Sequence, residues 1–321
     1  MNTLMKILMF VCVAFLGGIL THANASITSE QGIYVRDTGS VDGPCILFLH
    51  GGPGYNSWSF EAAMTDTLVT SGYRVITFDQ RGSGRSGSSD QSLYTFQQAL
   101  ADIDSILTAK NIQKTAVVGH SFGGTLALHW ARRNPERVSA LLLIGSPLSY
   151  PNTFATIKSN MNRADTSAYP GLAHSLNRLA NLDTSGVEYA GMCFAWAMKL
   201  GAYTARKPLD IGQRTVRRIS ALPDKKWLRN MTQAPFLGFL NNEKYTTLNL
   251  TPEARACASA GFPLLVLIGE HDGLFDGAHK LAWEHVLGAE RLQLVSNASH
   301  TVFVDRPDVV FDAIRNLVKT R

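Results

Sequence analysis

Apolar residues in this chain occur in short continuous runs that alternate with amphipathic stretches. A continuous run of about five apolar residues is typical of a strand that is buried on both faces of a parallel sheet. Stretches in which apolar residues recur every three or four positions, such as 95–110, predict helices. Strands that alternate with helices predict an α/β fold, with a mostly parallel sheet and flanking helices. The predicted strands cover 32–37, 45–49, 73–78, 116–118, 138–144, 264–268 and 292–295.

The alternation of strands and helices is interrupted between residues 148 and 250, where the sequence predicts aromatic-rich helices. We therefore expect an α/β core in two halves, 26–147 and 251–321, with an inserted helical lid at 148–250. The lid carries 13 lysine and arginine residues against six aspartate and glutamate residues, whereas the net charge of the whole chain is +5. This excess attracts anions, although basic residues spread along a segment are also typical of a solvated helical face. The sequence contains no recognisable nucleic-acid-binding module.

Residues 1–25 have the three parts of a secretory signal peptide. Lys6 precedes an apolar run at 7–16, and a small-x-small cleavage site ends at Ala25. We expect cleavage after Ala25 and a secreted or periplasmic protein. The alternative, a retained membrane anchor, is disfavoured because the run is short for a spanning helix. No later run is long and apolar enough to cross a membrane, so we expect no stable membrane span after cleavage.

Removal of the signal peptide would leave three cysteines, Cys45, Cys193 and Cys257. An odd number of cysteines in an exported chain is compatible with one disulfide or with none. The sequence therefore leaves open whether Cys193 and Cys257 are bridged. Cys45 is expected to be a small buried residue at the start of a strand.

A G-x-S-x-G motif spans Gly119–Gly123, with Ser121 at its centre. It follows the predicted strand at 116–118 and precedes a predicted helix. In the strand–turn–helix context, this motif places a serine hydroxyl at the exposed end of the sheet. The alternative is a glycine-rich turn whose serine only caps the helix. We interpret Ser121 as a nucleophile, which needs a base to remove its proton.

Two further strand ends carry the residues that would activate this serine. Asp272 follows the strand at 264–268, and His300 follows the last strand. Reactive groups gather beyond the carboxyl ends of parallel strands, and the chain order Ser, Asp, His is the one expected on such a sheet. We predict that His300 is the general base and that Asp272 orients its imidazole. Asp276 is the rival acid and His271 the rival base.

Acyl transfer also needs hydrogen-bond donors for the developing oxyanion. We assign this role to the backbone N–H groups of Phe122 and of Gly52, which lies in the segment His50–Gly54 after another strand. Pro53 has no N–H to donate. The sequence has neither a phosphate-binding P-loop nor a dinucleotide-binding motif. We expect no cofactor and no metal.

Together these segments resemble the α/β-hydrolase superfamily and, within it, the proline iminopeptidase-like peptidases. The resemblance covers both halves of the predicted core. It implies a lidded serine hydrolase that needs no metal and releases N-terminal residues, especially proline, from short peptides. The matching pieces are H-G-G-P-G at 50–54, F-D-Q-R-G-S-G-R-S at 78–86, G-H-S-F-G-G at 119–124, G-E-H-D at 269–272 and S-H at 299–300.

The sequence departs from the proline iminopeptidase pattern at two places. The nucleophile motif reads G-H-S-F-G, a form common in esterase-like relatives, where those peptidases typically have G-G-S-W-G. The stretch around Trp196 lacks the glutamate that the family uses to hold the substrate's amine, and Glu188 and Glu243 are the only glutamates of the lid. These three are the candidate substrate-binding residues.

The expected function is that of an exported serine hydrolase that cleaves amide or ester bonds through an acyl-enzyme, as a proline iminopeptidase-like aminopeptidase. A carboxylesterase or lipase-like hydrolase of small esters is the alternative, and a ligand-binding protein without catalytic activity is a further one. In each case the partner is a small molecule or a short peptide, and the oligomeric state is open.

Overall fold

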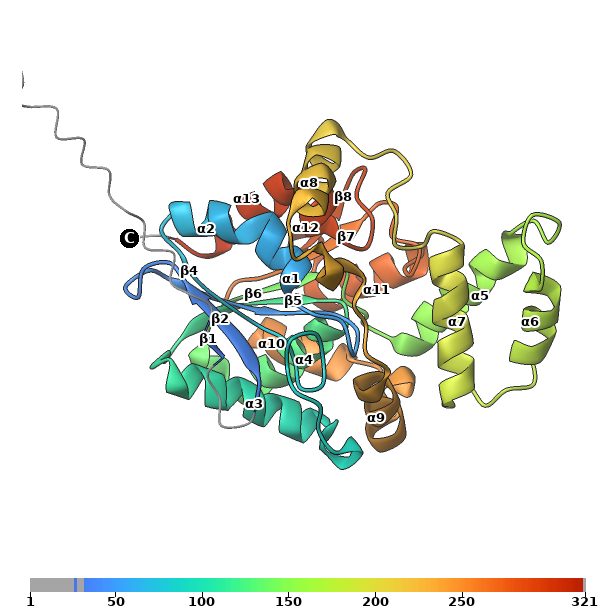
Figure 1. Ribbon diagram of the computed structural model, residues 1–321, viewed down its shortest axis with the longest axis horizontal. Coiled ribbons are helices and arrows are strands. Elements are labelled where there is room, and N and C mark those ends of the chain that lie inside the picture. The colour runs from blue at the N-terminus through green and yellow to red at the C-terminus, as the bar shows by residue number, and fades with distance from the viewer. Residues whose placement is uncertain (1–25, 28–31, 320–321) are drawn as a thin grey trace, which may run out of the picture.

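The computed structural model describes residues 26–27 and 32–319, and it contains an eight-stranded sheet with helices on both faces (Figure 1). The predicted signal peptide lies outside these residues. The strand order is β1-β2-β4-β3-β5-β6-β7-β8, antiparallel at β1 and β2 and parallel from β4 onward, which confirms the predicted α/β fold. The strands are β1 (Ser26–Ile27), β2 (Tyr34–Thr38), β3 (Cys45–Leu49), β4 (Arg74–Phe78), β5 (Thr115–His120), β6 (Val138–Ile144), β7 (Leu264–Gly269) and β8 (Leu292–Val295).

Successive residues of the central strands face opposite sides of the sheet, because side chains alternate along a strand. Phe48 of β3 stacks on Phe60 at 3.8 Å between ring centroids, on the face covered by α1, α2, α12 and α13. Its neighbours Leu47 and Leu49 belong to the core under α3, α4, α10 and α11. The continuous apolar runs in the sequence therefore reflect a sheet that is buried on both faces. The helices of the core are α1 (Trp58–Phe60), α2 (Asp66–Thr70), α3 (Phe96–Ala109), α4 (Phe122–Arg133), α10 (Thr251–Ser259), α11 (Gly277–Leu287), α12 (Val302–Asp305) and α13 (Pro307–Leu317).

The insertion between β6 and β7 is helical, and its two ends lie side by side. Ser149 pairs with Asn249 in an antiparallel bridge, flanked by a hydrogen bond of 2.7 Å from the Leu250 N–H to the Leu148 carbonyl. Helices α5, α6 and α7 project away from the sheet, whereas α8 packs against α12 (Figure 1). The insertion thus reaches both sides of the sheet's carboxyl edge. Its helices are α5 (Tyr150–Arg163), α6 (Leu172–Leu179), α7 (Val187–Lys199), α8 (Asp210–Ala221) and α9 (Gln233–Glu243).

The cysteines of the described residues are all free thiols. Cys193 in α7 and Cys257 in α10 are buried, and burial raises the pKa of both thiols to about 12. The disulfide that the sequence left open is therefore not formed. Cys45, expected to be buried, is half-buried at the first position of β3. Among the described helices, none has the length and apolar character needed to cross a membrane.

Close packing of α4 on β3 requires glycine at the start of that helix. A Cβ on Gly123 would lie 2.1 Å from the Leu49 carbonyl oxygen, and backbone cannot easily move away. We expect Gly123→Ala to lower the free energy of unfolding by about 3 kcal/mol, measured by chemical denaturation.

The matched control is Gly191→Ala within α7, where a Cβ would meet nothing within 4 Å. This variant should gain up to about 1 kcal/mol, since alanine is the better helix former. Equal stability of Gly123→Ala and the parent would contradict the packing described here.

Candidate active site

Ser121 lies in the turn between β5 and α4 with a strained backbone. Its φ and ψ are 53° and −123°, a region that residues other than glycine rarely adopt. The turn is held by hydrogen bonds from the Ser121 N–H to the Ile144 carbonyl, 2.9 Å, and from the Gly124 N–H to the Ser121 carbonyl, 2.8 Å. The side chain is half-buried at the N-terminus of α4, where the helix dipole favours negative charge. The predicted nucleophile thus has the geometry of a nucleophile turn.

Asp272 and His300 come together from the loops that follow β7 and β8. Nδ1 of His300 and Oδ2 of Asp272 are 2.8 Å apart, and both residues are almost fully buried. The other carboxylate oxygen accepts from the Leu274 N–H at 3.0 Å, which fixes the plane of the acid. An ionised carboxylate only accepts hydrogen bonds, so Nδ1 carries the proton and Nε2 is left as the basic nitrogen.

The structure brings His300 close to the serine turn without a hydrogen bond between the two side chains. Nε2 of His120, the residue before Ser121, donates to the His300 carbonyl at 3.1 Å, and the two rings lie 4.9 Å apart. The Ser121 hydroxyl forms no hydrogen bond with His300 or any other described residue. Catalytic hydrogen bonds are often long in proteins without substrate and shorten when it binds.

The rival residues have other contacts. Oδ1 of Asp276 accepts from the His279 N–H at 3.0 Å and caps α11, while its side chain is exposed. Nδ1 of His271 accepts from the Arg206 N–H at 3.3 Å. Neither one hydrogen bonds to His300 within the described part of the chain. The contact with His300 therefore distinguishes Asp272 from its rival.

The segment His50–Gly54 runs beside the serine turn. Gly52 has a φ of 129°, and its N–H has no acceptor among the described residues. The Phe122 N–H is also free of helical bonds, because Phe122 is the first residue of α4. Sequence reasoning missed Gly51, where a Cβ would lie 2.9 Å from the Ser121 Cβ. The absence of a Cβ at Gly51 therefore allows this loop to approach Ser121 closely.

The model of the α/β-hydrolase fold family matches residues 44–307, which is most of the chain. The protein belongs to this family. Its core strands from β3 to β8 all lie inside the matched region, as do Ser121, Asp272 and His300.

Within the family, the chain is similar to proline iminopeptidase-like proteins, as its motifs predicted. It is 27% identical over 285 residues to the proline iminopeptidase PfmaB of Pestalotiopsis fici, which covers 88% of this chain and 94% of that protein. The crystal structure of a proline iminopeptidase-related protein from Thermus thermophilus is 25% identical with a TM-score of 0.67, over 92% of this chain and 97% of that one. An esterase from Exiguobacterium antarcticum has the same fold, with 18% identity and a TM-score of 0.59 over 89% and 95% of the two chains.

A buried ionic network supports the His50–Gly54 loop of this α/β-hydrolase. Arg85 donates through Nε to Asp79 at 2.7 Å and through Nη2 to Glu61 at 2.7 Å. Burial alone would raise the pKa of Asp79, but the hydrogen bonds and charge of Arg85 outweigh it and hold that pKa below its ordinary value. The next residue, Gln80, donates its backbone N–H to His50 Nε2 at 2.8 Å and its amide to the His50 carbonyl at 2.7 Å. The network therefore fixes the start of the loop.

The insertion also contacts this loop, through Thr232. The Thr232 N–H donates to the Gly54 carbonyl at 2.9 Å, and its hydroxyl donates to the Gly82 carbonyl at 2.6 Å. Asn56 donates to the carbonyl of Trp227 at 2.8 Å. The segment between α8 and α9 therefore holds the His50–Gly54 loop from outside the core. No signal in the sequence pointed to this contact.

The three candidate substrate-binding residues of the lid each have contacts of their own. Glu188 is exposed and forms an ion pair with Arg178. Glu243 accepts the Phe96 N–H at 2.7 Å and so completes the N-terminus of α3. Trp196 is buried against Tyr169. None of the three hydrogen bonds to Ser121, Asp272 or His300 in the described structure, and their role in substrate binding stays a prediction.

Within residues 26–27 and 32–319, no cluster of three histidine, cysteine, aspartate or glutamate side chains is placed to hold a metal ion.

Two buried histidines make the site sensitive to acid. Burial lowers the pKa of His50, and burial with the nearby His300 lowers that of His120 well below its ordinary value. In the unfolded chain both histidines titrate at about pH 6.5. Below that pH the unfolded state therefore binds more protons than the folded state. The contribution of these two histidines should therefore be constant above pH 7 and decrease as the pH falls below about 6.5, with a limiting slope of about 1.4 kcal/mol per pH unit for each histidine that stays neutral in the folded state.

Chemical denaturation between pH 7.5 and 5 measures this loss. His120→Gln should reduce the slope, whereas His174→Gln, at an exposed position in α6, should leave it unchanged. A slope that His120→Gln leaves intact would mean that His120 is not neutral in the folded protein.

Proposed function

We propose that this protein is a serine hydrolase that cleaves amide or ester bonds through an acyl-enzyme. The observation that carries the proposal is the Asp272–His300 hydrogen bond of 2.8 Å beside the strained turn of Ser121. These residues come from three different strand ends, and nothing in ordinary packing requires them to meet. The relatives with proline iminopeptidase names support a hydrolase on this scaffold.

In the proposed reaction, Nε2 of His300 takes the proton of the Ser121 hydroxyl as the oxygen attacks the substrate's carbonyl carbon. The N–H groups of Phe122 and Gly52 donate to the resulting oxyanion. His300 then passes the proton to the leaving amine or alcohol, and the acyl group stays on Ser121. Water, deprotonated by the same imidazole, releases the acid and restores the serine. Asp272 stabilises the imidazolium in both steps.

Two substrate classes have support. The likeness to proline iminopeptidase-like proteins over most of the chain favours short peptides with a free N-terminus. The contacts of Glu188 with Arg178 and of Glu243 with α3 favour small esters, because neither carboxylate is free to hold a substrate's amine. The chemistry at Ser121 is the same for both.

A side-by-side rate comparison tests the proposal. The purified protein is assayed on proline β-naphthylamide and on p-nitrophenyl esters from acetate to octanoate. Turnover of the amide that disappears when its amine is blocked would establish an aminopeptidase, and turnover of esters alone would establish an esterase. Absence of turnover on both series, with a folded protein, would contradict the proposed function.

A further inference from the structure

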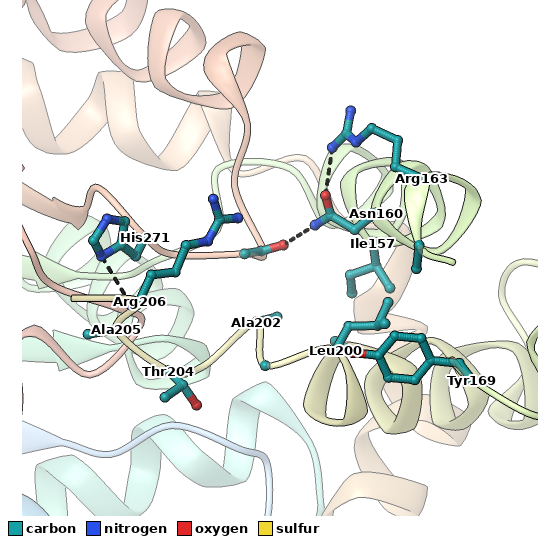
Figure 2. Close-up of a pocket in the computed structure, with 14 residues that line it drawn as sticks. Ile157, Asn160, Arg163, Tyr169, Leu200, Ala202, Thr204, Ala205, Arg206 and His271 are labelled. Atoms are coloured by element: carbon teal, nitrogen blue, oxygen red, sulfur yellow. Dashed lines mark hydrogen bonds between the residues drawn. The ribbon is translucent and has the colours of Figure 1, made fainter. Parts of the chain in front are cut away.

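A pocket of about 540 Å³ lies beside the loop that carries Asp272, between that loop and helices α5 and α7 (Figure 2). Its volume is in the range of small-molecule binding sites. Neither Ser121 nor His300 contributes to its lining. The pocket is therefore distinct from the site at which we place the reaction.

The polar side of the pocket is cationic. Arg206 lies on one side, near His271, and Asn160 with Arg163 lies on the other (Figure 2). The described residues that line the pocket include no aspartate or glutamate. Arg163 donates to Asn160 Oδ1 at 2.6 Å, and neither guanidinium forms an ion pair with a described residue. Two positive charges are thus available to an anion.

The other side of the pocket is apolar. Ile157 of α5, Leu200 at the end of α7 and the ring of Tyr169 lie together there (Figure 2). Asn160 is fixed by its amide, which donates to the Gly273 carbonyl at 2.8 Å, so the boundary between the two sides is rigid. A wall of this kind buries a hydrocarbon group, and the guanidinium groups beside it match a carboxylate in charge and shape.

The loop 200–206 separates this pocket from the catalytic histidine. Ala202 accepts the Gly273 N–H at 2.8 Å, which ties the loop to the residue after Asp272. The Tyr203 ring packs edge-on against His300 at 5.2 Å between centroids, while Thr204 and Arg206 line the pocket. A ligand in the pocket would therefore contact the loop on the side opposite His300.

We propose that this pocket binds a small amphipathic carboxylic acid in its ionised form. Arg163 and Arg206 bind the carboxylate, and the wall of Ile157, Leu200 and Tyr169 covers the hydrocarbon chain. The proposal concerns binding alone, so it does not depend on the reaction at Ser121.

Isothermal titration of the full protein with sodium octanoate tests the proposal, with octanamide as the neutral probe of the same length. Octanoate should bind with a dissociation constant of about 1 mM or lower, and octanamide at least about tenfold more weakly. The double variant Arg163→Gln/Arg206→Gln should lose about tenfold or more in octanoate affinity. Arg206→Lys should retain part of it, because the charge remains.

The control is Arg255→Gln, an exposed arginine of α10 outside the pocket, which should bind octanoate as the parent does. Both pocket arginines are exposed, so melting temperatures should agree within a few degrees across the set. Unchanged octanoate affinity in the double variant would place the acid elsewhere and overturn the proposal, and so would equal binding of octanoate and octanamide.

Discussion

Ser121→Ala is expected to lower kcat by about 10⁵-fold on any substrate that the protein hydrolyses, because the attacking oxygen is lost and only the oxyanion donors and binding remain. The fold should be kept. Alanine is no more strained than serine at a φ of 53°, and the Ser121 hydroxyl forms no hydrogen bond with a described residue. Steady-state kinetics together with thermal unfolding measure both effects.

The matched control is Ser146→Ala, at the end of the neighbouring strand β6. The Ser146 hydroxyl is buried and has no hydrogen-bond partner among the described residues, so it has neither access to substrate nor a base. This variant should keep its kcat within a few-fold of the parent. Full activity in Ser121→Ala would show that the G-x-S-x-G serine is only a turn residue.

Asp272→Asn is expected to lower kcat by about 10⁴-fold with little change in stability. The shape of the side chain is preserved, but an amide carries no charge to stabilise the imidazolium. Its NH₂ group can also donate to Nδ1, which would move the proton of His300 to Nε2, the nitrogen that must accept from serine. The loss should appear in kcat with KM changed little, because Asp272 is buried behind the histidine and does not touch substrate.

Asp276→Asn provides the comparison, since this acid caps α11 four residues further along the chain. Asparagine is also a good cap, so both activity and stability should stay near those of the parent. The reverse pattern, with a large loss in Asp276→Asn and a small one in Asp272→Asn, would exchange the roles of the two acids.

The core of the fold could be predicted because its strands are buried on both faces and therefore read as continuous apolar runs. Asp272 and His300 could be predicted for a related reason. Each follows such a run at the carboxyl edge of the sheet, where residues far apart in sequence converge. The sequence favoured Asp272 over Asp276 by its distance from the strand end, and the structure supplies the physical reason in the helix cap that Asp276 forms.

Contacts between the insertion and the core could not be predicted, because they join residues that are distant in sequence and have no local pattern. Glu243 binds the N-terminus of α3, 147 positions away. Thr232 holds Gly54 and Gly82 by hydrogen bonds, and Tyr203 covers His300. The resemblance to proline iminopeptidases made the lid glutamates candidates for an amine site, and only the packing reveals that Glu243 binds the backbone of α3.

The most direct test of the proposed nucleophile is covalent labelling of the protein with a fluorophosphonate, followed by mass spectrometry of its tryptic peptides. We expect one adduct, on the peptide that contains Ser121, and its loss in both Ser121→Ala and His300→Gln. Labelling of a different residue, or equal labelling of parent and Ser121→Ala, would contradict the claim that His300 activates Ser121 as the nucleophile.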